Sequence, residues 1–310
     1  MVTPSPFDRM LQQASQQAAQ DPAAAFAQLE ALFGKSLTDQ DVRNLAGLSA
    51  HIGGAMLGRW ADTAAFLRRC LEHPAVEKDG DSARSIWRAL SVIHTCAGQE
   101  AEATDAFAAG VRNAGEHCRM SVICAQMLVA RRELIRAVPH LEKAAELCAE
   151  LPAGDEVLTQ VAAIGANIAR NAEATLTSAR NLLLAADAAS AAACARLGDW
   201  RSEHKALFQQ GRGFVAAGRP VPALGVVQRL MALEEANQAG PVERFFSASL
   251  ACRAQMLRGQ MKVAAGAYQA CRDLAGQVED AKAREMVEKA LTRLTDDLAA
   301  DKAERDRWQG

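Results

Sequence analysis

Aromatic residues are scarce in this chain of 310 residues, since they make up 5% of it and only one is a tyrosine. Prolines are few as well, with 9 in the whole sequence, so long stretches contain no residue that would break a helix. Alanine, by contrast, accounts for about a fifth of all residues. Because alanine is the best helix former and fills little core volume, this composition favours closely packed helices over thick sheets.

An excess of charge of either sign is also absent. The chain has 35 lysines and arginines against 37 aspartates and glutamates, which gives a formal net charge of −2. A protein that binds nucleic acid in general needs a strongly basic surface, so we expect no nucleic acid among its partners. A hydrophobic fraction of 50% with 23% charged residues also argues against a disordered tail.

Long hydrophobic runs are missing, and a membrane-spanning helix needs about 18 or more apolar residues. The best candidate, residues 182–195, is interrupted by Asp187 and Ser190. The first twenty residues carry Asp8 and Arg9 followed by glutamines, where a secretory signal would have an apolar segment. We therefore expect a cytoplasmic protein that does not insert into a membrane.

The eight cysteines are too sparse for a disulfide framework and form no CxxC pair. The closest two, Cys118 and Cys124, are six residues apart. His117 beside Cys118 is the only adjacent histidine–cysteine pair, and no partner at helical spacing completes a tetrahedral set. We expect reduced thiols that pack as small hydrophobic residues, and no metal site.

A helical frame around Gly98 is the clearest local pattern. Glycine supplies the left-handed backbone conformation that commonly ends a helix. Large and small residues recur at helical spacing on both sides of it: Trp87, Leu90, Ser91 and His94 before, and Ala103, Phe107 and Gly110 after. This pattern predicts two helices of about a dozen residues each, joined by a tight turn.

The frame recurs at intervals of 34–41 residues, which is typical of helical repeats. The recurrences fall at Cys124, Ala125, Leu128, Ala137, Leu141 and Ala144; at Gly58, Thr63, Leu67 and Cys70; at Gly218, Ala223, Val227 and Leu230; and at Gly259, Ala264, Tyr268 and Cys271. Equivalent positions of the frame keep a large or a small residue even where the residue type changes.

With these positions the sequence resembles the tetratricopeptide repeat family, over residues 44–151 and 204–275. The residues that best match the family pattern are Trp87, Leu90, Gly98, Ala103 and Phe107, together with the run 137–144. The resemblance implies an all-α, right-handed superhelical solenoid of antiparallel helix pairs.

The domain layout follows from this frame. The expected segments are N-terminal capping helices over 1–43, three tetratricopeptide-like units over 44–151, an irregular helical segment over 152–203, two further units over 204–278, and a C-terminal capping helix over 279–310. Within the first segment, helices are expected near 6–19 and 22–33, the second capped by Asp21. The run 197–200 predicts another turn between helices.

Sequence motifs of catalysis are weak throughout. Gly34-Lys35-Ser36 resembles the end of a phosphate-binding loop, but Leu29 stands where that loop needs its first glycine. No GxSxG, HExxH or calcium-binding loop motif is present. We therefore expect no enzymatic activity, no catalytic residue and no cofactor.

In a solenoid of this kind, the first helix of each unit lines a concave face. Twenty-five positions of the frame fall on this face, of which five are basic and none is acidic. The residues assigned to the partner-binding groove are Arg88, Thr95, Arg119, Gln126, Lys205, Phe208, Arg212, Phe246 and Arg253. The other sixteen positions are small or apolar: Leu45, Leu48, Ile52, Ala55, Met56, Ser85, Val92, Cys96, Val122, Val129, Ala130, Val215, Ala216, Ser249, Met256 and Leu257.

Arginine binds carboxylates through two parallel hydrogen bonds, so this face predicts a groove for an acidic segment of a protein partner. A second interpretation is that the arginines pair with neighbouring helices or stay solvated. Two functions fit the groove: a cytoplasmic scaffold (adaptor, dedicated chaperone or assembly factor), or a regulatory sensor in which a peptide or small ligand changes the curvature. The sequence leaves the oligomeric state open.

Overall fold

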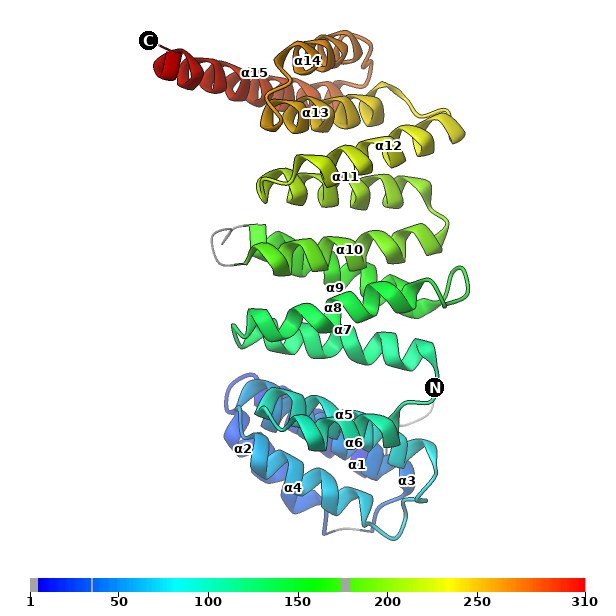
Figure 1. Cartoon of the computed structure of the whole chain (residues 1–310). Coiled ribbons are helices and arrows are strands. Elements are labelled where there is room, and N and C mark those ends of the chain that lie inside the picture. Colours follow the sequence, from blue (N-terminus) through cyan, green and yellow to red (C-terminus); the bar gives the residue numbers. More distant parts are fainter. Residues whose placement is uncertain (1–4, 35, 174–178, 310) are drawn as a thin grey trace. The chain divides into compact units, whose positions relative to one another are not determined.

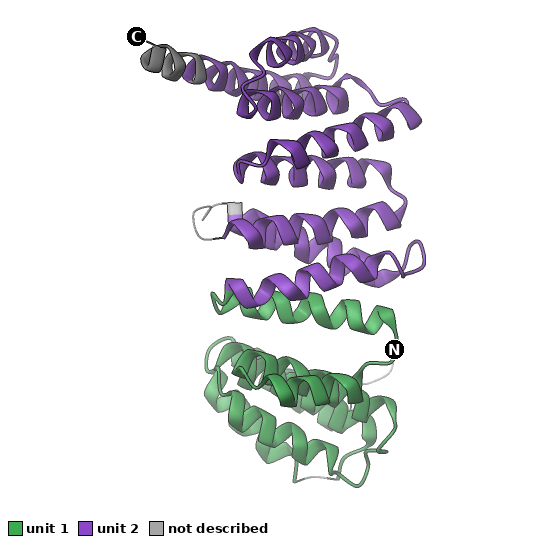
Figure 2. Cartoon of the chain, in the orientation of Figure 1, with its two compact units in different colours: residues 1–133 green, residues 134–310 purple. Residues whose placement is uncertain are grey.

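The computed structural model describes residues 5–34, 36–173 and 179–309, which form helices joined by short connections (Figure 1). These residues contain no strand, so the expected all-α fold is confirmed. The chain divides into two compact units, residues 1–133 and residues 134–310 (Figure 2). Each unit has buried hydrophobic clusters of its own.

The first unit is built from eight helical segments in its described part. They are α1 (Pro6–Ala18), α2 (Pro22–Leu32), α3 (Asp39–Ser49), the π-helix η1 (Ala50–Met56), α4 (Trp60–Leu71), α5 (Asp81–Ala97), α6 (Glu100–Gly110) and α7 (Ala114–Ala130). The helices expected near 6–19 and 22–33 are confirmed as α1 and α2. The Asp21 carboxylate caps α2 by accepting a hydrogen bond from the Ala24 N–H, 3.0 Å away.

The helix pair expected around Gly98 is confirmed as α5 and α6, which pack against each other. Gly98 has φ 76°, the left-handed conformation that glycine adopts without a steric penalty. Helix α5 is longer than the expected dozen residues, at 17, because it begins at Asp81, directly after Gly80. Helix α6 has 11 residues.

The π-helix η1 depends on two adjacent glycines. A Cβ atom on Gly53 would lie 2.3 Å from Thr63 Oγ1 and 2.4 Å from the Phe26 ring. One on Gly54 would lie 2.4 Å from Ile93 Cδ1. The backbone of η1 therefore approaches its neighbours more closely than any side chain would allow, and this close packing belongs to the core of the first unit.

The second unit follows the same principle of consecutive packed helices. They are α8 (Leu134–Cys148), α9 (Glu156–Glu173), α10 (Arg180–Leu197), α11 (Trp200–Ala216), α12 (Pro220–Ala236), α13 (Pro241–Leu257), α14 (Met261–Ala275) and α15 (Ala281–Gln309). Neighbours along the chain contact each other from α8 to α15. The turn expected at 197–200 is confirmed, since Gly198 ends α10 in the left-handed conformation with φ 76°.

The segment that the repeat frame left irregular contains two helices of 18 residues each, α9 and α10. They pack closely because Gly165 faces the backbone of α10, where a Cβ would lie 2.9 Å from the Ala186 carbonyl oxygen. The Ser190 hydroxyl donates a hydrogen bond of 3.1 Å to the Ala162 carbonyl. A small-residue contact of this kind draws two helices together without large side chains.

All eight cysteines are free thiols and buried, which confirms their expected role in packing. Burial raises the pKa of Cys70, Cys124 and Cys271 to about 12 and that of Cys252 to about 11. In the described part of the chain, no helix combines the length and the apolar character needed to cross a membrane.

Candidate functional site

The nine predicted groove residues are divided between the two units. Arg88, Thr95, Arg119 and Gln126 lie in the first unit, on α5 and α7, and Lys205, Phe208, Arg212, Phe246 and Arg253 lie in the second, on α11 and α13. The structure brings some members of each set together within their own unit.

The prediction that Thr95 lines an open groove is wrong, because its side chain is buried. It is 5% exposed, and its hydroxyl accepts a weak hydrogen bond from the Cys124 thiol, 4.0 Å away on α7. Thr95 therefore sits in the interface between α5 and α7 and is not available to a partner. Five other positions assigned to the concave face are also buried: Leu45, Ile52, Cys96, Val122 and Ser249.

A basic cleft lies in the first unit and has a volume of about 390 Å³. It is lined by residues of α3, η1, α5 and α7: Arg43, Ala50, His51, Ala55, Ser85, Arg88, Ala89, Val92, Ile93, Glu116, Arg119, Met120, Ile123 and Met127. Two predicted groove residues, Arg88 and Arg119, are thus brought to one site. Gln126 is exposed on α7 but does not line this cleft.

Arg88 is the fixed centre of the basic cleft. Its Nη1 donates hydrogen bonds to Glu116 Oε1 at 2.8 Å and to the Gly110 carbonyl at 3.1 Å, which holds α5 to the end of α6 and the start of α7. Burial lowers the pKa of the Arg88 guanidinium; the Glu116 carboxylate opposes this, and the charges of Arg43, Arg84 and Arg119 add to it. The cleft therefore has more basic than acidic side chains: Arg43 and Arg119 lie near Arg88, and Glu116 is the one acid in the lining.

Two residues that line the cleft were not predicted from the sequence: Arg43 on α3 and His51 on η1. Both are exposed, and within the described residues neither side chain makes a hydrogen bond or ion pair. Arg43 lies in the segment 1–43 that was expected to cap the repeats, outside the frame. His51 was missed because the frame assumed α-helical spacing through residues 45–56, whereas η1 is a π-helix with more residues per turn. The adjacent Gly53-Gly54 is the one sequence signal that could have indicated this change of geometry.

The cleft combines charge with apolar surface. Val92, Ile123 and Met127 are partly exposed beside the arginines, and Met120 is buried behind them. Methionine side chains adapt to ligands of different shape, and they occur at surfaces that bind several partners. The arrangement can therefore accept a carboxylate together with an aliphatic or aromatic group.

The predicted residues of the second unit form two separate features. Phe208 and Phe246 lie side by side, with ring centroids 5.1 Å apart. Arg253 is engaged by the C-terminal helix, since its Nε and Nη2 both lie 3.0 Å from Asp297 Oδ2 on α15. Its pairing with a neighbouring helix fits the second interpretation of the sequence.

The other two basic residues that were predicted for the groove in the second unit, Lys205 and Arg212, differ in their contacts. Lys205 is exposed on α11, and Arg212 donates a hydrogen bond of 2.9 Å to Gln209 Oε1 one turn earlier. The expectation of a face without acids does not hold locally, because Glu116 and Asp297 come from other positions to reach Arg88 and Arg253.

A buried polar cluster in the second unit contains His204, Glu234 and Ser247, on α11, α12 and α13. His204 Nε2 lies 2.8 Å from Glu234 Oε1, and the Ser247 hydroxyl donates to the same oxygen. In a catalytic triad the serine donates to one imidazole nitrogen while the other nitrogen donates to the acid. Here both donors converge on the acid, so the cluster connects three helices and does not activate the serine.

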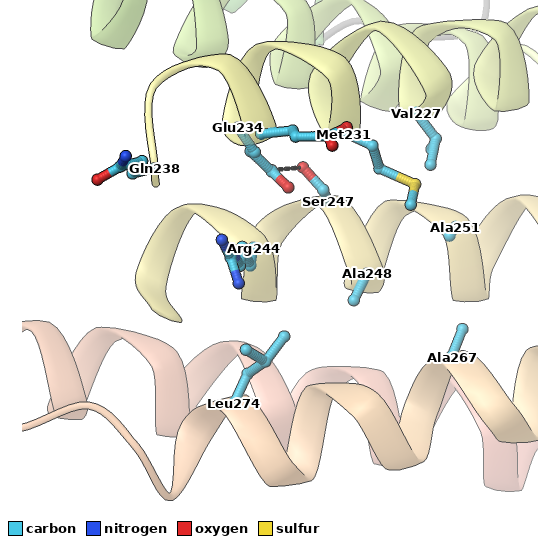
Figure 3. A pocket seen from close by; sticks show the side chains of 11 residues that line it. Val227, Met231, Glu234, Gln238, Arg244, Ser247, Ala248, Ala251, Ala267 and Leu274 are labelled. Atoms are coloured by element: carbon cyan, nitrogen blue, oxygen red, sulfur yellow. Dashed lines mark hydrogen bonds between the residues drawn. The ribbon is translucent and has the colours of Figure 1, made fainter. Parts of the chain in front are cut away.

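An apolar groove borders this cluster and has a volume of about 570 Å³ (Figure 3). Residues of α12, α13, α14 and the connection between α12 and α13 line it: Val227, Met231, Glu234, Glu235, Gln238, Arg244, Ser247, Ala248, Ala251, Ala267 and Leu274. None of the predicted groove residues lines it. In the part of the chain that the structure describes, no group of three or more histidine, cysteine or acidic side chains is arranged to hold a metal ion.

The chain matches no protein-family model, and no curated protein is significantly similar to it. The resemblance to tetratricopeptide repeats therefore depends on the repeated residue frame alone.

Proposed function

We propose that this protein is a cytoplasmic, non-enzymatic interaction scaffold that binds an acidic segment of a protein partner in the basic cleft. Its helix pairs are tetratricopeptide-like and form a right-handed superhelical solenoid. The observation that supports the function best is the gathering of Arg43, Arg88 and Arg119 with His51 around an apolar floor. The chain as a whole is slightly acidic, so this concentration of positive charge is local.

The partner segment should carry glutamate or aspartate next to an aliphatic or aromatic side chain. Arg43 and Arg119 supply guanidinium groups that match a carboxylate, while Met127 and Ile123 supply apolar contact. Arg88 is already paired with Glu116, so its role is to hold the cleft and to add to its field. Because such contacts are exposed, affinity should fall as the salt concentration rises.

The test uses a fluorescently labelled amphipathic peptide with leucines and glutamates on one helical face, titrated with the full chain. We expect binding that weakens clearly between about 50 and about 150 mM salt. Arg43→Glu should weaken it several-fold, and Arg43→Glu with Arg119→Glu more than tenfold. Arg9→Glu is the matched control, because Arg9 is an exposed helical arginine of the same unit outside the cleft.

Equal binding by Arg43→Glu and Arg9→Glu, with unchanged melting temperatures, would refute the cleft as the site. Failure of the peptide to bind at low salt would refute the preference for acidic segments. Co-purification from the native cell with the parent and the double variant then identifies the partner, which the double variant should not retain.

A regulatory sensor is the second candidate, and η1 is the observation that favours it. Ala50, His51 and Ala55 of this π-helix line the cleft, and π-helices occur frequently at functional sites. A bound ligand would contact η1 directly and could change its geometry. Hydrogen exchange of residues 50–56 with and without the acidic peptide tests this, since a sensor requires a change in protection there.

A further inference from the structure

The apolar groove of the second unit holds an incompletely paired carboxylate. Glu234 is 6% exposed, and its Oε1 accepts hydrogen bonds from Ser247 and His204. Among the described residues its second oxygen, Oε2, has no hydrogen-bond partner, although Glu234 lines the groove. Figure 3 shows this side chain between α12 and α13, at the wall of the groove.

Oε2 is not fully buried, so it faces the groove as an accessible acceptor, and a carboxylate oxygen can only accept a hydrogen bond. A group that enters the groove here must therefore be a donor, and a positively charged donor makes the strongest bond. An acidic ligand is disfavoured because it would place a second negative charge beside Glu234. Glu235, exposed on the same helix, adds negative charge at the rim.

Arg244 is the one basic residue that lines the groove. It is exposed, and in the described residues no ion pair joins it to Glu234 or Glu235. Its guanidinium therefore does not neutralise either acid of the groove. The two acids outnumber the one basic residue in the lining, so an incoming group meets a net negative charge.

The rest of the groove is apolar and shaped for aliphatic side chains. Ala248, Ala251 and Ala267 leave space along α13 and α14, and Leu274 lies near one end (Figure 3). Met231 is 58% exposed at the wall and offers apolar surface to an incoming side chain. A volume of about 570 Å³ lies within the range of ligand pockets.

We propose that this groove binds a segment of another protein that presents a lysine or arginine beside aliphatic side chains. The basic group bonds to Glu234 Oε2, and the aliphatic groups cover Met231 and the alanines of α13 and α14. This site lies in the other unit from the basic cleft and prefers the opposite charge. It does not depend on the function proposed for the cleft.

The test follows the methionine methyl groups of the full-length protein by nuclear magnetic resonance after labelling with [methyl-13C]methionine. Met231 reports on the apolar groove, and Met120 and Met127 report on the basic cleft. The probes are two amphipathic peptides that differ only in lysine or glutamate beside their leucines. We expect the lysine peptide to shift the Met231 signal and the glutamate peptide to leave it unchanged.

Variants then test the role of the carboxylate. Glu234→Gln should weaken the lysine peptide by about tenfold, because it replaces a charge-assisted bond by a neutral group. Glu288→Gln, an exposed change on α15 that alters the net charge equally, should have no effect. Met231→Lys leaves the His204–Ser247 contacts intact and should abolish binding, as measured by anisotropy of the labelled peptide.

The proposal is overturned if both peptides shift Met231 equally, if neither does so at millimolar concentration, or if Glu234→Gln and Met231→Lys both bind like the parent. A shift of Met231 by spermidine as large as that by the peptide would also overturn it, because the groove would then select charge without the aliphatic segment.

Discussion

The two sites make opposite use of charge, although both lie among packed helices and both include methionine. In the basic cleft, cations from three helices gather around one ion pair, Arg88–Glu116, whose Arg88 side chain is 23% exposed. In the apolar groove, the Glu234 carboxylate accepts hydrogen bonds from His204 and Ser247, and Glu235 adds a second acid at the rim. We expect the first site to select acidic ligands and the second to select basic ones.

The largest expected difference between the units concerns the contacts His204–Glu234 and Arg88–Glu116. His204→Ala should lower the free energy of unfolding by about 3 kcal/mol, because it removes a hydrogen-bond donor from the largely buried Glu234 carboxylate. Arg88→Ala should cost about 1 kcal/mol, since water can solvate Glu116 instead. Urea unfolding followed by circular dichroism measures both. His204→Gln restores a donor and should recover part of the loss; equal costs at the two positions would contradict this ordering.

The next effect tests whether the basic cleft depends on η1. Gly53→Ala places a methyl group against Thr63 and Phe26 and should cost about 1–3 kcal/mol. Gly47→Ala on α3 is the control, because its Cβ meets nothing within 4 Å, and it should stabilise by about 0.5–1 kcal/mol. Gly53→Ala should also weaken the glutamate peptide while the lysine peptide binds as before. A parallel loss of both peptides would show that the two sites are not independent.

A smaller effect concerns the one negatively charged residue that lines the basic cleft, Glu116. Glu116→Gln removes the one acid that lines the basic cleft while an amide oxygen can still accept from Arg88. The glutamate peptide should therefore bind about two- to fivefold more tightly at low salt. Glu102→Gln, exposed on α6, changes the net charge equally and should leave anisotropy titrations unchanged. No tightening with Glu116→Gln would mean that the field of the cleft does not guide binding.

Most of the helices could be predicted from the sequence because the residues that begin and end them act locally. Gly98 and Gly198 both end helices in the left-handed conformation, and Asp21 caps α2, as their residue types indicate. The burial of the cysteines followed from their small positions in the repeat frame. Each of these features is determined by a few adjacent residues.

The sites were predicted only in part, because they depend on contacts distant in the sequence. Arg88 and Arg119 were placed on one face. Arg43 was assigned to the capping segment, and His51 was missed because a π-helix changes the spacing before α5. Asp297 reaches Arg253 from 44 residues away, so an acid-free set of positions did not mean an acid-free surface. Glu234 carried no sequence signal, since its role depends on three helices meeting at one oxygen.

The last effect is one that both units should share, and it appears only at alkaline pH. Burial raises the pKa of Cys70 and Cys124 in the first unit, and of Cys271 in the second, from 9.0 to about 12. The folded protein therefore keeps these thiols protonated where the unfolded chain would release their protons. This stabilisation is fully present below about pH 9 and is lost as the pH rises from there to about 12.

Urea unfolding at about pH 8 and about pH 10.5 should show this loss, and a thiol reagent at about pH 8 should modify the native protein far more slowly than the unfolded chain. Cys70→Ala with Cys271→Ala should be nearly neutral at pH 8, because both positions accept small residues, and should reduce the alkaline loss. Cys271→Leu is the packing control and should cost about 1–3 kcal/mol at either pH. If the double alanine variant lost as much stability as the parent between the two pH values, ionisation of these thiols could not be the cause, and the tyrosine and lysines would have to be tested instead.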